Sequence, residues 1–225
     1  MTQRVSQIDC APPRAQTIAG GTVQTLPTGY AATIDGDTAY VTIGTGITGG
    51  SEPDAGAVVS ILLRDILGGL IGPLDGSRLL VGVLQLDIID PPSDGSDVVA
   101  WAAIAGTADT SGGYIGCGIK YASTRVMTAL RETTGGAEAP LNSTVITGHV
   151  CTMQAYTDSD GHLSAVMIID GPTDNPGTVE RGITGYAAVA ASGSYLQVGA
   201  YSPTVPGAPI TVGIRARARY LPAAL

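Results

Sequence analysis

Apolar and β-branched residues come in short runs along this chain, and Gly, Pro, Asp and Ser separate the runs. Runs of this length with turn-forming residues between them are typical of β-strands. The runs that predict strands lie at residues 30–34, 38–44, 78–89, 97–106, 114–122, 125–133, 143–157, 162–170, 182–190, 195–202 and 210–221. So many strands at near-regular spacing predict an all-β sandwich or barrel.

The first two runs are separated by Asp35, Gly36 and Asp37. An Asp-Gly pair between β-type runs predicts a tight hairpin. Residues 91–95 (Pro-Pro-Ser-Asp-Gly) and 158–161 (Asp-Ser-Asp-Gly) predict turns between later strands in the same way.

The segment 56–74 is ambiguous. Its apolar residues recur at helical spacing, and they are Val58, Val59, Leu62, Leu63, Ile66, Leu67 and Leu70. The same run could be a buried strand followed by a Gly-rich loop. We favour a helical turn here and leave the strand open.

Residues 1–29 are polar and contain Pro12, Pro13 and Pro27. They predict an extended N-terminal arm with little core of its own, followed by one sandwich domain at 30–225. The arm either docks on a neighbouring subunit or is a loose terminus.

Composition narrows the function classes. Hydrophobic residues make up 44% of the 225 residues and aromatic residues only 4%, so the core must consist mainly of Val, Ile, Leu and Ala. Charged residues make up 13%, about half the usual share, so the surface is either rich in short polar side chains or buried against other chains. The net charge of −8, without a Lys/Arg cluster, argues against nucleic-acid binding.

The three cysteines, Cys10, Cys117 and Cys151, form no Cys-x-x-Cys pair and predict reduced thiols, without a disulfide framework or a zinc site. The first 20 residues contain no continuous apolar stretch, so we expect no signal peptide. The longest apolar segment, 57–71, is interrupted by Ser60, Arg64 and Asp65, so we expect no transmembrane helix.

Gly44, Gly46 and Gly49 match the spacing Gly-x-Gly-x-x-Gly after a strand. The alternating strand–helix pattern and the acidic residue that a dinucleotide site requires do not follow. A flexible loop is the better interpretation, and no cofactor is predicted.

The run 158–161 begins like a calcium loop, but the twelfth position, where a bidentate Glu is needed, is Ile169. Asp158 and Asp160 could still bind calcium together with carbonyl groups, although a plain hairpin turn explains them better. His149 and His162 are the only histidines, and without a Gly-x-Ser-x-Gly sequence we predict no catalytic residues.

Arg215, Arg217 and Arg219 alternate within the last predicted strand, which places all three on one face. Arginine forms bidentate pairs with carboxylates, so this row is a candidate contact with an acidic subunit surface. Arg4 and Arg14 in the arm are further candidates for partner binding. The alternative is a solvated face that pairs with the chain's own Asp and Glu residues.

Three stretches resemble concanavalin A-like (laminin G-like) jelly-roll domains: residues 79–119, the predicted hairpin 149–171, and the closing strands 194–222 with the sequence Leu-x-x-Gly-Ala-Tyr at 196–201. The resemblance implies a jelly-roll β-sandwich. Such domains occur in lectins, glycosidases and phage virion proteins.

Some glycosidases of this fold carry a Glu-x-Asp-x-x-Glu strand whose carboxylates share one face. Here the corresponding residues are Gln85, Asp87 and Asp90. An amide cannot act as the nucleophile, and Asp90 is one methylene shorter than Glu, so we do not expect catalysis.

The resemblance and the Lys-poor composition together imply, by analogy, a non-enzymatic phage virion protein. We expect it to decorate or cement a capsid, to bind the major capsid or another virion protein, and to form a homo-oligomer, with a trimer possible. It would reside in virions assembled in the host cytoplasm. The alternatives are a lectin-like carbohydrate-binding module, with Trp101 and the tyrosines available to stack on a glycan, or a catalytically inactive glycosidase-like domain.

Overall fold

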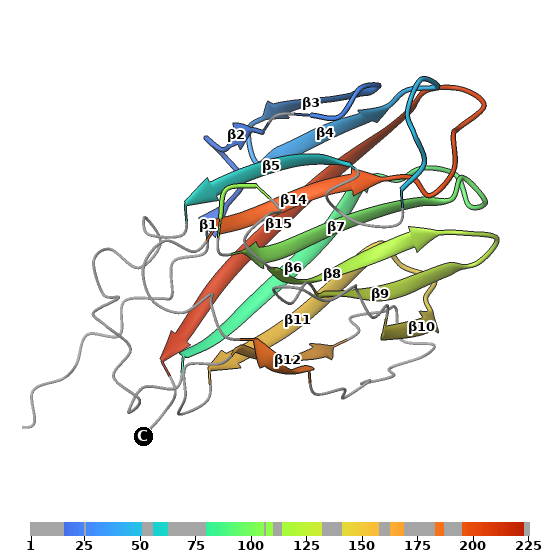
Figure 1. Cartoon of the computed structure of the whole chain (residues 1–225). Helices are drawn as coiled ribbons and strands as arrows, with labels where there is room; N and C mark the ends of the chain where they lie inside the picture. The colour runs from blue at the N-terminus through green and yellow to red at the C-terminus, as the bar shows by residue number, and fades with distance from the viewer. Residues whose placement is uncertain are drawn as a thin grey trace, which may run out of the picture.

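The computed structural model describes residues 16–24, 26–50, 56–62, 80–105, 107–109, 114–131, 141–157, 163–168, 183–186 and 195–222. Within these ranges every regular element is a strand, and the strands form two antiparallel sheets that face each other (Figure 1). No helix in the described ranges is long and apolar enough to cross a membrane.

Sheet A has eight strands. Its order is β13 (Ile183–Tyr186), β12 (Leu163–Ile168), β11 (Val150–Thr157), β6 (Leu80–Asp90), β15 (Ile210–Pro222), β4 (Thr38–Ile43) and β3 (Tyr30–Asp35), and β1 (Gln16–Thr17) also pairs with β15. Sheet B has seven strands, in the order β10 (Leu141–Val145), β9 (Arg125–Arg131), β8 (Tyr114–Tyr121), β7 (Val98–Ala105), β14 (Tyr195–Tyr201), β5 (Ala57–Leu62) and β2 (Thr22–Val23).

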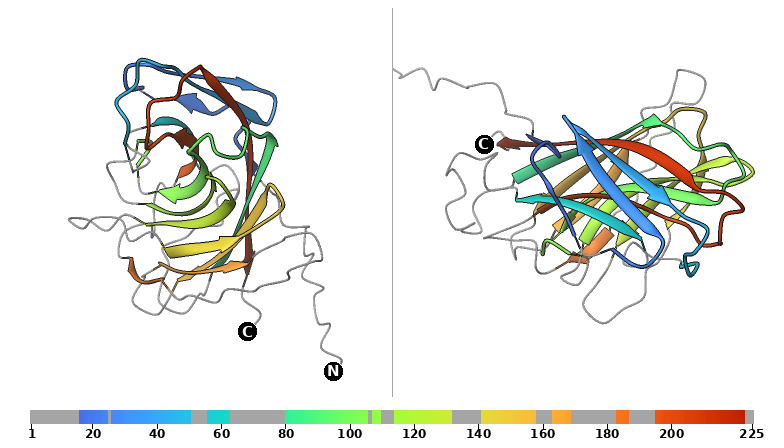
Figure 2. Two further views of the ribbon diagram at one scale, coloured as in Figure 1. Left: turned by 90° about the vertical axis from the view of Figure 1, so that its right-hand side faces the viewer. Right: turned by 90° about the horizontal axis from the view of Figure 1, so that it is seen from above.

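The chain passes repeatedly from one sheet to the other. Strands β4, β6, β11 and β15 belong to sheet A, whereas β5, β7, β10 and β14 lie between them in sequence and belong to sheet B. Sheet A curves around sheet B from β3 and β4 through β15 and β6 to β11 and β12 (Figure 2). The predicted all-β jelly-roll sandwich is therefore confirmed.

Alternate residues of each strand fill the space between the sheets. Leu84, Leu86 and Ile88 of β6 belong to this core, as do Val98 and Ala100 of β7. The core is mostly aliphatic, as the composition predicts, and the shortage of aromatic residues is met by close packing of Ala, Val, Ile and Leu.

The helical turn favoured for 56–74 is wrong for residues 57–62, which form strand β5 between β14 and β2. The reason is that both faces of this strand are buried: Ala57, Val58, Val59 and Ser60 are all at most 5% exposed. A strand buried on both faces has no polar alternation, so its apolar run can imitate helical spacing. Residues 63–74 lie outside the described residues.

Two predicted hairpins are confirmed. Strands β3 and β4 pair in a register that leaves Gly36 and Asp37 as the turn, and Gly36 has a φ of 58°. Strands β11 and β12 pair antiparallel over 152–157 and 163–168, as the sequence 149–171 predicts. Strands β14 and β15, the closing strands of the resemblance, lie in opposite sheets.

Part of the segment predicted as an arm contributes to the sandwich. Strand β1 pairs with β15 in sheet A, and β2 pairs with β5 in sheet B. Ile18 between them is 0% exposed and belongs to the core. Residues 1–15 lie outside the described residues, so the predicted arm and domain boundaries stay predictions.

Candidate functional site

The outward surface of sheet A is a polar, threonine-rich face. Its strand register places Arg215 and Arg217 of β15 beside Asp87 and Gln85 of β6 and, on the other side, Arg215 beside Thr38 of β4. Val212, Ile214, Ala216 and Ala218 alternate with these residues and lie in the core. We call this surface, made by the outward residues of β3, β4, β15 and β6, the sheet A face.

The three predicted arginines of β15 differ in their surroundings. Arg215 is half-exposed, and its Nε lies 2.9 Å from Asp37 Oδ1 and 2.9 Å from Thr38 Oγ1. Arg217 is exposed, and among the described residues nothing pairs with its guanidinium. Arg219 pairs with Val83 through the strand register, but its side chain lies outside what the structure describes. Arg4 and Arg14 lie outside the described residues.

A β-bulge brings the polar residues of β6 onto this same face. Asp87 is in register with Arg215 and Asp90 with Gly213, so Ile89 is the extra residue. A Cβ placed on Gly213 would meet Asp90 Cβ at 3.0 Å and Tyr40 Cε1 at 3.1 Å, which shows that both side chains flank this glycine. The bulge therefore gives Gln85, Asp87 and Asp90 a common face, but the first of them is an amide.

The glycines at 44, 46 and 49 have a structural role in a loop that follows β4. A Cβ on Gly44 would lie 2.8 Å from the carbonyl oxygen of Gly29, and a Cβ on Gly49 would collide with the carbonyl oxygen of Pro203. Gly44 N also donates to Gly29 O at 2.7 Å. Close backbone approach accounts for glycine at positions 44 and 49.

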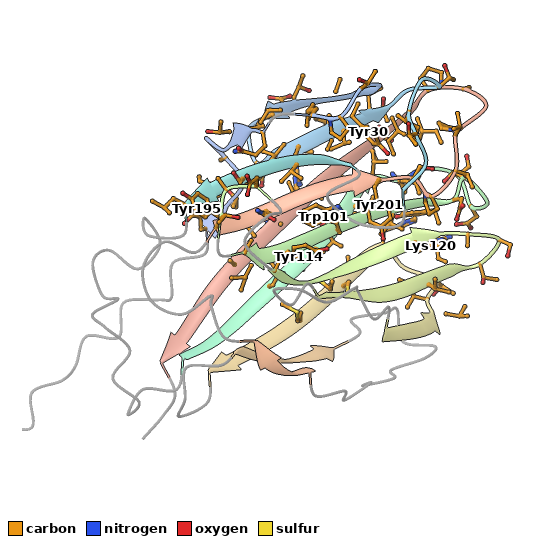
Figure 3. All side chains as sticks on the ribbon, in the orientation of Figure 1. Tyr30, Trp101, Tyr114, Lys120, Tyr195 and Tyr201 are labelled. Atoms are coloured by element: carbon orange, nitrogen blue, oxygen red, sulfur yellow. The ribbon has the colours of Figure 1, made fainter. Side chains whose placement is uncertain are left out.

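The outward surface of sheet B carries a second, buried cluster. Its members are Val58, Val99, Trp101, Ala103, Ala105, Tyr114 and Tyr201. These residues alternate with the core residues of the same strands, so they lie on the side of sheet B that faces away from sheet A (Figure 3). Trp101 stacks on Tyr114 with ring centroids 6.3 Å apart and an interplanar angle of 24°.

Two buried polar atoms on this surface have no hydrogen-bond partner: Trp101 Nε1, a donor, and Gln197 Oε1, an acceptor. Gln197 Nε2 is bound to the carbonyl oxygens of Thr107 and Asp109 at 2.9 and 2.6 Å, which fixes the amide. Buried polar groups are normally paired, so each of these two atoms is a point at which this surface can still make a hydrogen bond. We call Trp101, Tyr114 and Gln197 the sheet B site.

A third polar cluster joins the two sheets at one end of the sandwich. Tyr121 Oη lies 2.9 Å from His149 Nδ1, and Arg125 Nη1 lies 3.0 Å from His149 Nε2. Arg125 also binds the carboxylate of Asp94 through Nε and Nη2 at 2.9 and 3.3 Å. The sequence analysis missed this cluster, since its members are separated by up to 55 residues and share no motif.

Burial is the main cause of the pKa shifts in this cluster. It raises the pKa of the Tyr121 hydroxyl and lowers the pKa of the His149 imidazole. The positive charge of Arg125 further lowers the pKa of His149, whereas the negative charges of Asp94 and Asp87 raise it. Both shifts favour the neutral form of the group.

No group of three or more His, Cys, Asp or Glu side chains is placed to hold a metal ion within the described ranges. Asp158 and Asp160, the candidate calcium ligands, lie outside those ranges, as do His162 and Cys10. Cys117 and Cys151 are buried, and neither forms a disulfide within the described ranges.

No protein-family model and no curated protein matches the chain. Similar solved structures include peanut lectin, with 12% identity, coverage of 96% of this chain and 100% of that chain, and a TM-score of 0.44. The CBM2 module of the evolved Dit of Lactobacillus casei BL23 phage J-1 has 8% identity, coverage of 95% and 99%, and a TM-score of 0.47. A carbohydrate esterase from the Shiga toxin-encoding bacteriophage phi24B has 12% identity, coverage of 92% and 99%, and a TM-score of 0.45. The likeness concerns the fold, and the proteins that share it include binding modules, an enzyme and phage proteins.

Proposed function

We propose that the chain is a non-enzymatic structural protein of a phage virion, a capsid decoration or cement protein that acts by adhesion. Its partners would be neighbouring capsid subunits, and its contact surface the sheet A face. The observation that carries the proposal is Arg217, an exposed cation on a rigid strand with no ion pair among the described residues.

The surroundings of Arg217 suit a surface that becomes buried on assembly. Thr33, Thr42 and Thr211 lie on the sheet A face, and Thr17 of the adjoining strand β1 lies beside Arg217. Thr42 and Thr211 hydrogen-bond through their hydroxyls at 3.0 Å. Short β-branched side chains lose little rotamer freedom when a partner covers them. Such a face therefore costs little conformational entropy to bury, compared with one made of Lys and Glu.

Arg217 would fix the orientation of the partner subunit on this face. Its direct neighbours in the sheet are Gln85 of β6 and Thr17 of β1, both uncharged, which leaves the guanidinium available to a carboxylate of the partner. An Arg–carboxylate contact is bidentate and directional, so it fixes orientation as well as adding binding energy. Arg215 is already paired with Asp37 and would play a smaller part.

The same proposal includes a symmetric homo-oligomer, with a trimer possible on a capsid lattice, and a location in the virion after assembly in the host cytoplasm. Residues 1–15, with Arg4 and Arg14, would add a second contact.

The test uses virions produced from the genome that encodes this chain, carrying Arg217→Ala, Arg217→Lys or Arg217→Glu. We expect fewer copies per particle and release at lower denaturant for Arg217→Ala, a larger loss for Arg217→Glu, and partial retention for Arg217→Lys. Thr204→Ala, a change on an exposed loop, is the matched control. Wild-type occupancy of particles by Arg217→Glu, with thermal unfolding unchanged, would refute this contact. Absence of the wild-type chain from purified particles would refute the virion role.

The sheet B site favours a second candidate function, carbohydrate binding. Sugar hydroxyls both donate and accept, so they can serve as the acceptor for Trp101 Nε1 and as the donor for Gln197 Oε1, two atoms that lack a hydrogen-bond partner. Aromatic rings such as Trp101 and Tyr114 offer apolar faces to sugar rings. Both Trp101 and Gln197 are 0% exposed, so binding needs a state in which this surface is open, and the apparent affinity falls with the population of that state.

A glycan array with wild-type protein, Trp101→Phe and Val145→Thr separates the two candidates. Trp101→Phe keeps an aromatic ring and removes the N–H donor, whereas Val145 is an exposed residue of sheet B outside the site. Carbohydrate binding predicts reproducible hits that Trp101→Phe weakens and Val145→Thr leaves unchanged. An array without hits for the wild-type protein, or hits insensitive to Trp101→Phe, would exclude the sheet B site as a glycan site.

A further inference from the structure

Four side chains meet where the chain crosses between the sheets. Asp94 lies in the loop 91–97 that connects β6 of sheet A with β7 of sheet B, and His149 ends the connection 146–149 from β10 of sheet B to β11 of sheet A. Tyr121 ends β8 and Arg125 begins β9, and the turn between these strands lies at the same end of the molecule (Figure 1).

The guanidinium of Arg125 binds both connections that cross between the sheets, the loop 91–97 and the segment 146–149. Arg125 binds the Asp94 carboxylate of the first through two nitrogens, at 2.9 and 3.3 Å. It donates to the carbonyl oxygen of Thr147 in the second at 2.6 Å, and Ile146 N donates back to Arg125 O at 3.0 Å. Its Nη1 also contacts His149 Nε2 at 3.0 Å, so the position of Arg125 depends on the state of that ring.

The contact with Arg125 determines which form of His149 fits. A guanidinium can only donate hydrogen bonds, so His149 Nε2 must be the acceptor. The proton of the neutral ring is then on Nδ1, which donates to Tyr121 Oη at 2.9 Å. A protonated ring would direct an N–H from Nε2 at the N–H of Arg125 and would place two positive charges about one hydrogen-bond length apart.

We infer that Asp94, Tyr121, Arg125 and His149 form a proton-operated clasp: uptake of one proton by His149 displaces Arg125 and frees the part of the loop 91–97 around Asp94. Four further contacts join this loop to the sandwich without Arg125. Gly95 N donates to Ala122 O and Asp97 N to Tyr121 O, both at 2.8 Å. Asp97 Oδ1 also pairs with Lys120 Nζ at 2.9 Å, and Asp97 O accepts from Ser202 Oγ at 3.2 Å, so the Asp97 end of the loop is held independently of His149. The loop also lines one side of a groove of about 540 Å³ whose other side is formed by residues 204–210. Proton uptake therefore changes the shape of this groove.

The charged groups around His149 determine the pH range in which its ring takes up a proton. Arg125 of β9 opposes protonation, and so does burial of the ring, whereas Asp94 of the loop 91–97 and Asp87 of β6 favour it. Tyr121 of β8 faces the ring as a neutral hydroxyl. The net effect lowers the pKa of His149 below its ordinary value of 6.5.

Because folding lowers the pKa of His149, the stability of the protein decreases as the pH falls. Between the lowered pKa of folded His149 and the ordinary value of 6.5, the unfolded chain binds a proton that the folded chain does not. The clasp therefore makes its full contribution to the free energy of unfolding above pH 6.5. This contribution is lost as the pH falls from 6.5 through the lowered pKa of folded His149.

NMR of the full-length protein tests the ring directly. The side-chain ¹⁵N shifts of His149, assigned by comparison with His149→Gln, should report a neutral ring protonated at Nδ1 at about pH 8 and a titration below the ordinary pKa. His162, the other histidine, is the internal reference. A ring protonated at Nε2, or a titration at or above the ordinary pKa, would overturn the clasp.

Hydrogen exchange tests the release of the loop. After correction for intrinsic rates, the amide of Gly95, next to Asp94, should lose protection severalfold between about pH 8 and about pH 5 in the wild-type protein. The amide of Asp97, which is held by contacts that do not involve Arg125, should keep its protection. His149→Gln offers an amide oxygen to Arg125 and cannot be protonated in this range, so its loop should stay protected at both pH values. Equal loss of protection in both proteins, or no loss in the wild type, would show that His149 does not operate the loop.

Discussion

Single residues decide how closely the strands of sheet B approach the aromatic cluster. Gly199 lies opposite Trp101 in the pairing of β14 with β7. A Cβ at position 199 would collide with the carbonyl oxygen of Ala57 and would lie 2.7 Å from Trp101 Cζ2. Glycine is therefore the residue that lets the indole lie flat against the sheet.

We predict that Gly199→Ala destabilises the protein, because either the strand β5 or the indole of Trp101 must move. Overpacking of this kind costs about 1–3 kcal/mol, and urea unfolding measures it. Gly207→Ala is the matched control, since a Cβ there meets nothing within 4 Å. Equal midpoints for the two variants would contradict the packing described for Trp101.

The alternation of residues along a strand predicts which face a charged side chain lies on, but not which residue it pairs with. Alternation correctly predicts that Arg215 and Arg217 share one outward face. It does not predict that Asp37, on the neighbouring hairpin, binds Arg215 and leaves Arg217 exposed. The pairing partner of each arginine depends on strand order, which the spacing of residues along one strand does not contain.

At the scale of elements, the hairpin of β3 and β4 is determined locally. Its two turn residues are Gly36 and Asp37, and Gly36 has a φ of 58°, a conformation that glycine adopts without steric cost. The turn could therefore be predicted from three consecutive residues.

We predict that Gly36→Ala lowers the free energy of unfolding by about 1–2 kcal/mol, the usual cost of a left-handed conformation for a residue with a Cβ. Gly36→Asn should cost less, because Asn tolerates that region better. A Cβ at position 36 meets nothing within 4 Å, so backbone strain alone is tested. Gly46→Ala is the control, since that loop glycine has neither a positive φ nor a close neighbour. Thermal or urea unfolding that ranks Gly46→Ala as the most destabilised would argue against this turn.

The conformation of strand β5, in contrast, is determined by contacts with residues far away in the sequence. Its apolar run fits both helical spacing and a buried strand, because the neighbouring strands β14 and β2 and the cluster around Trp101 cover it on all sides. The choice between helix and strand was made by pairing with residues about 140 positions away, such as Val198 with Val59.

At the scale of the whole molecule, part of the N-terminal segment belongs to the folded sandwich. Ile18 is buried in the core, and β1 and β2 extend one sheet each. We predict that removal of residues 1–23 lowers the free energy of unfolding by several kcal/mol, since loss of one buried Ile side chain alone costs about 2–5 kcal/mol. Removal of residues 1–15 is the matched variant that retains both strands and Ile18.

Calorimetry measures the stability of both truncated proteins, and particle binding measures assembly. If residues 1–15 serve as the proposed contact, their removal should reduce particle binding while the unfolding temperature stays close to that of the full chain. Equal unfolding temperatures for the two truncations would contradict the part that β1, β2 and Ile18 have in the sandwich.

By itself, the sequence determined the class of fold. Turn residues between short β-type runs, with too few aromatic residues for any but an aliphatic core, allow little besides a layered all-β structure, because each strand must bury one face. The sequence likewise determined the hairpin turns and the common face of Arg215 and Arg217, since both depend on local geometry.

Only the tertiary structure decided which distant residues meet. Trp101 with Gly199, and His149 with Tyr121 and Arg125, come from strands or connections that become neighbours through the strand order of the two sheets. The same holds for Arg125 with Asp94. The bulge at Ile89, which gives Asp87 and Asp90 a common face, likewise exists only in the pairing of β6 with β15. Contacts between connections that cross from sheet to sheet leave no periodic trace along the chain, which is the physical reason why the clasp around His149 could not be predicted from sequence.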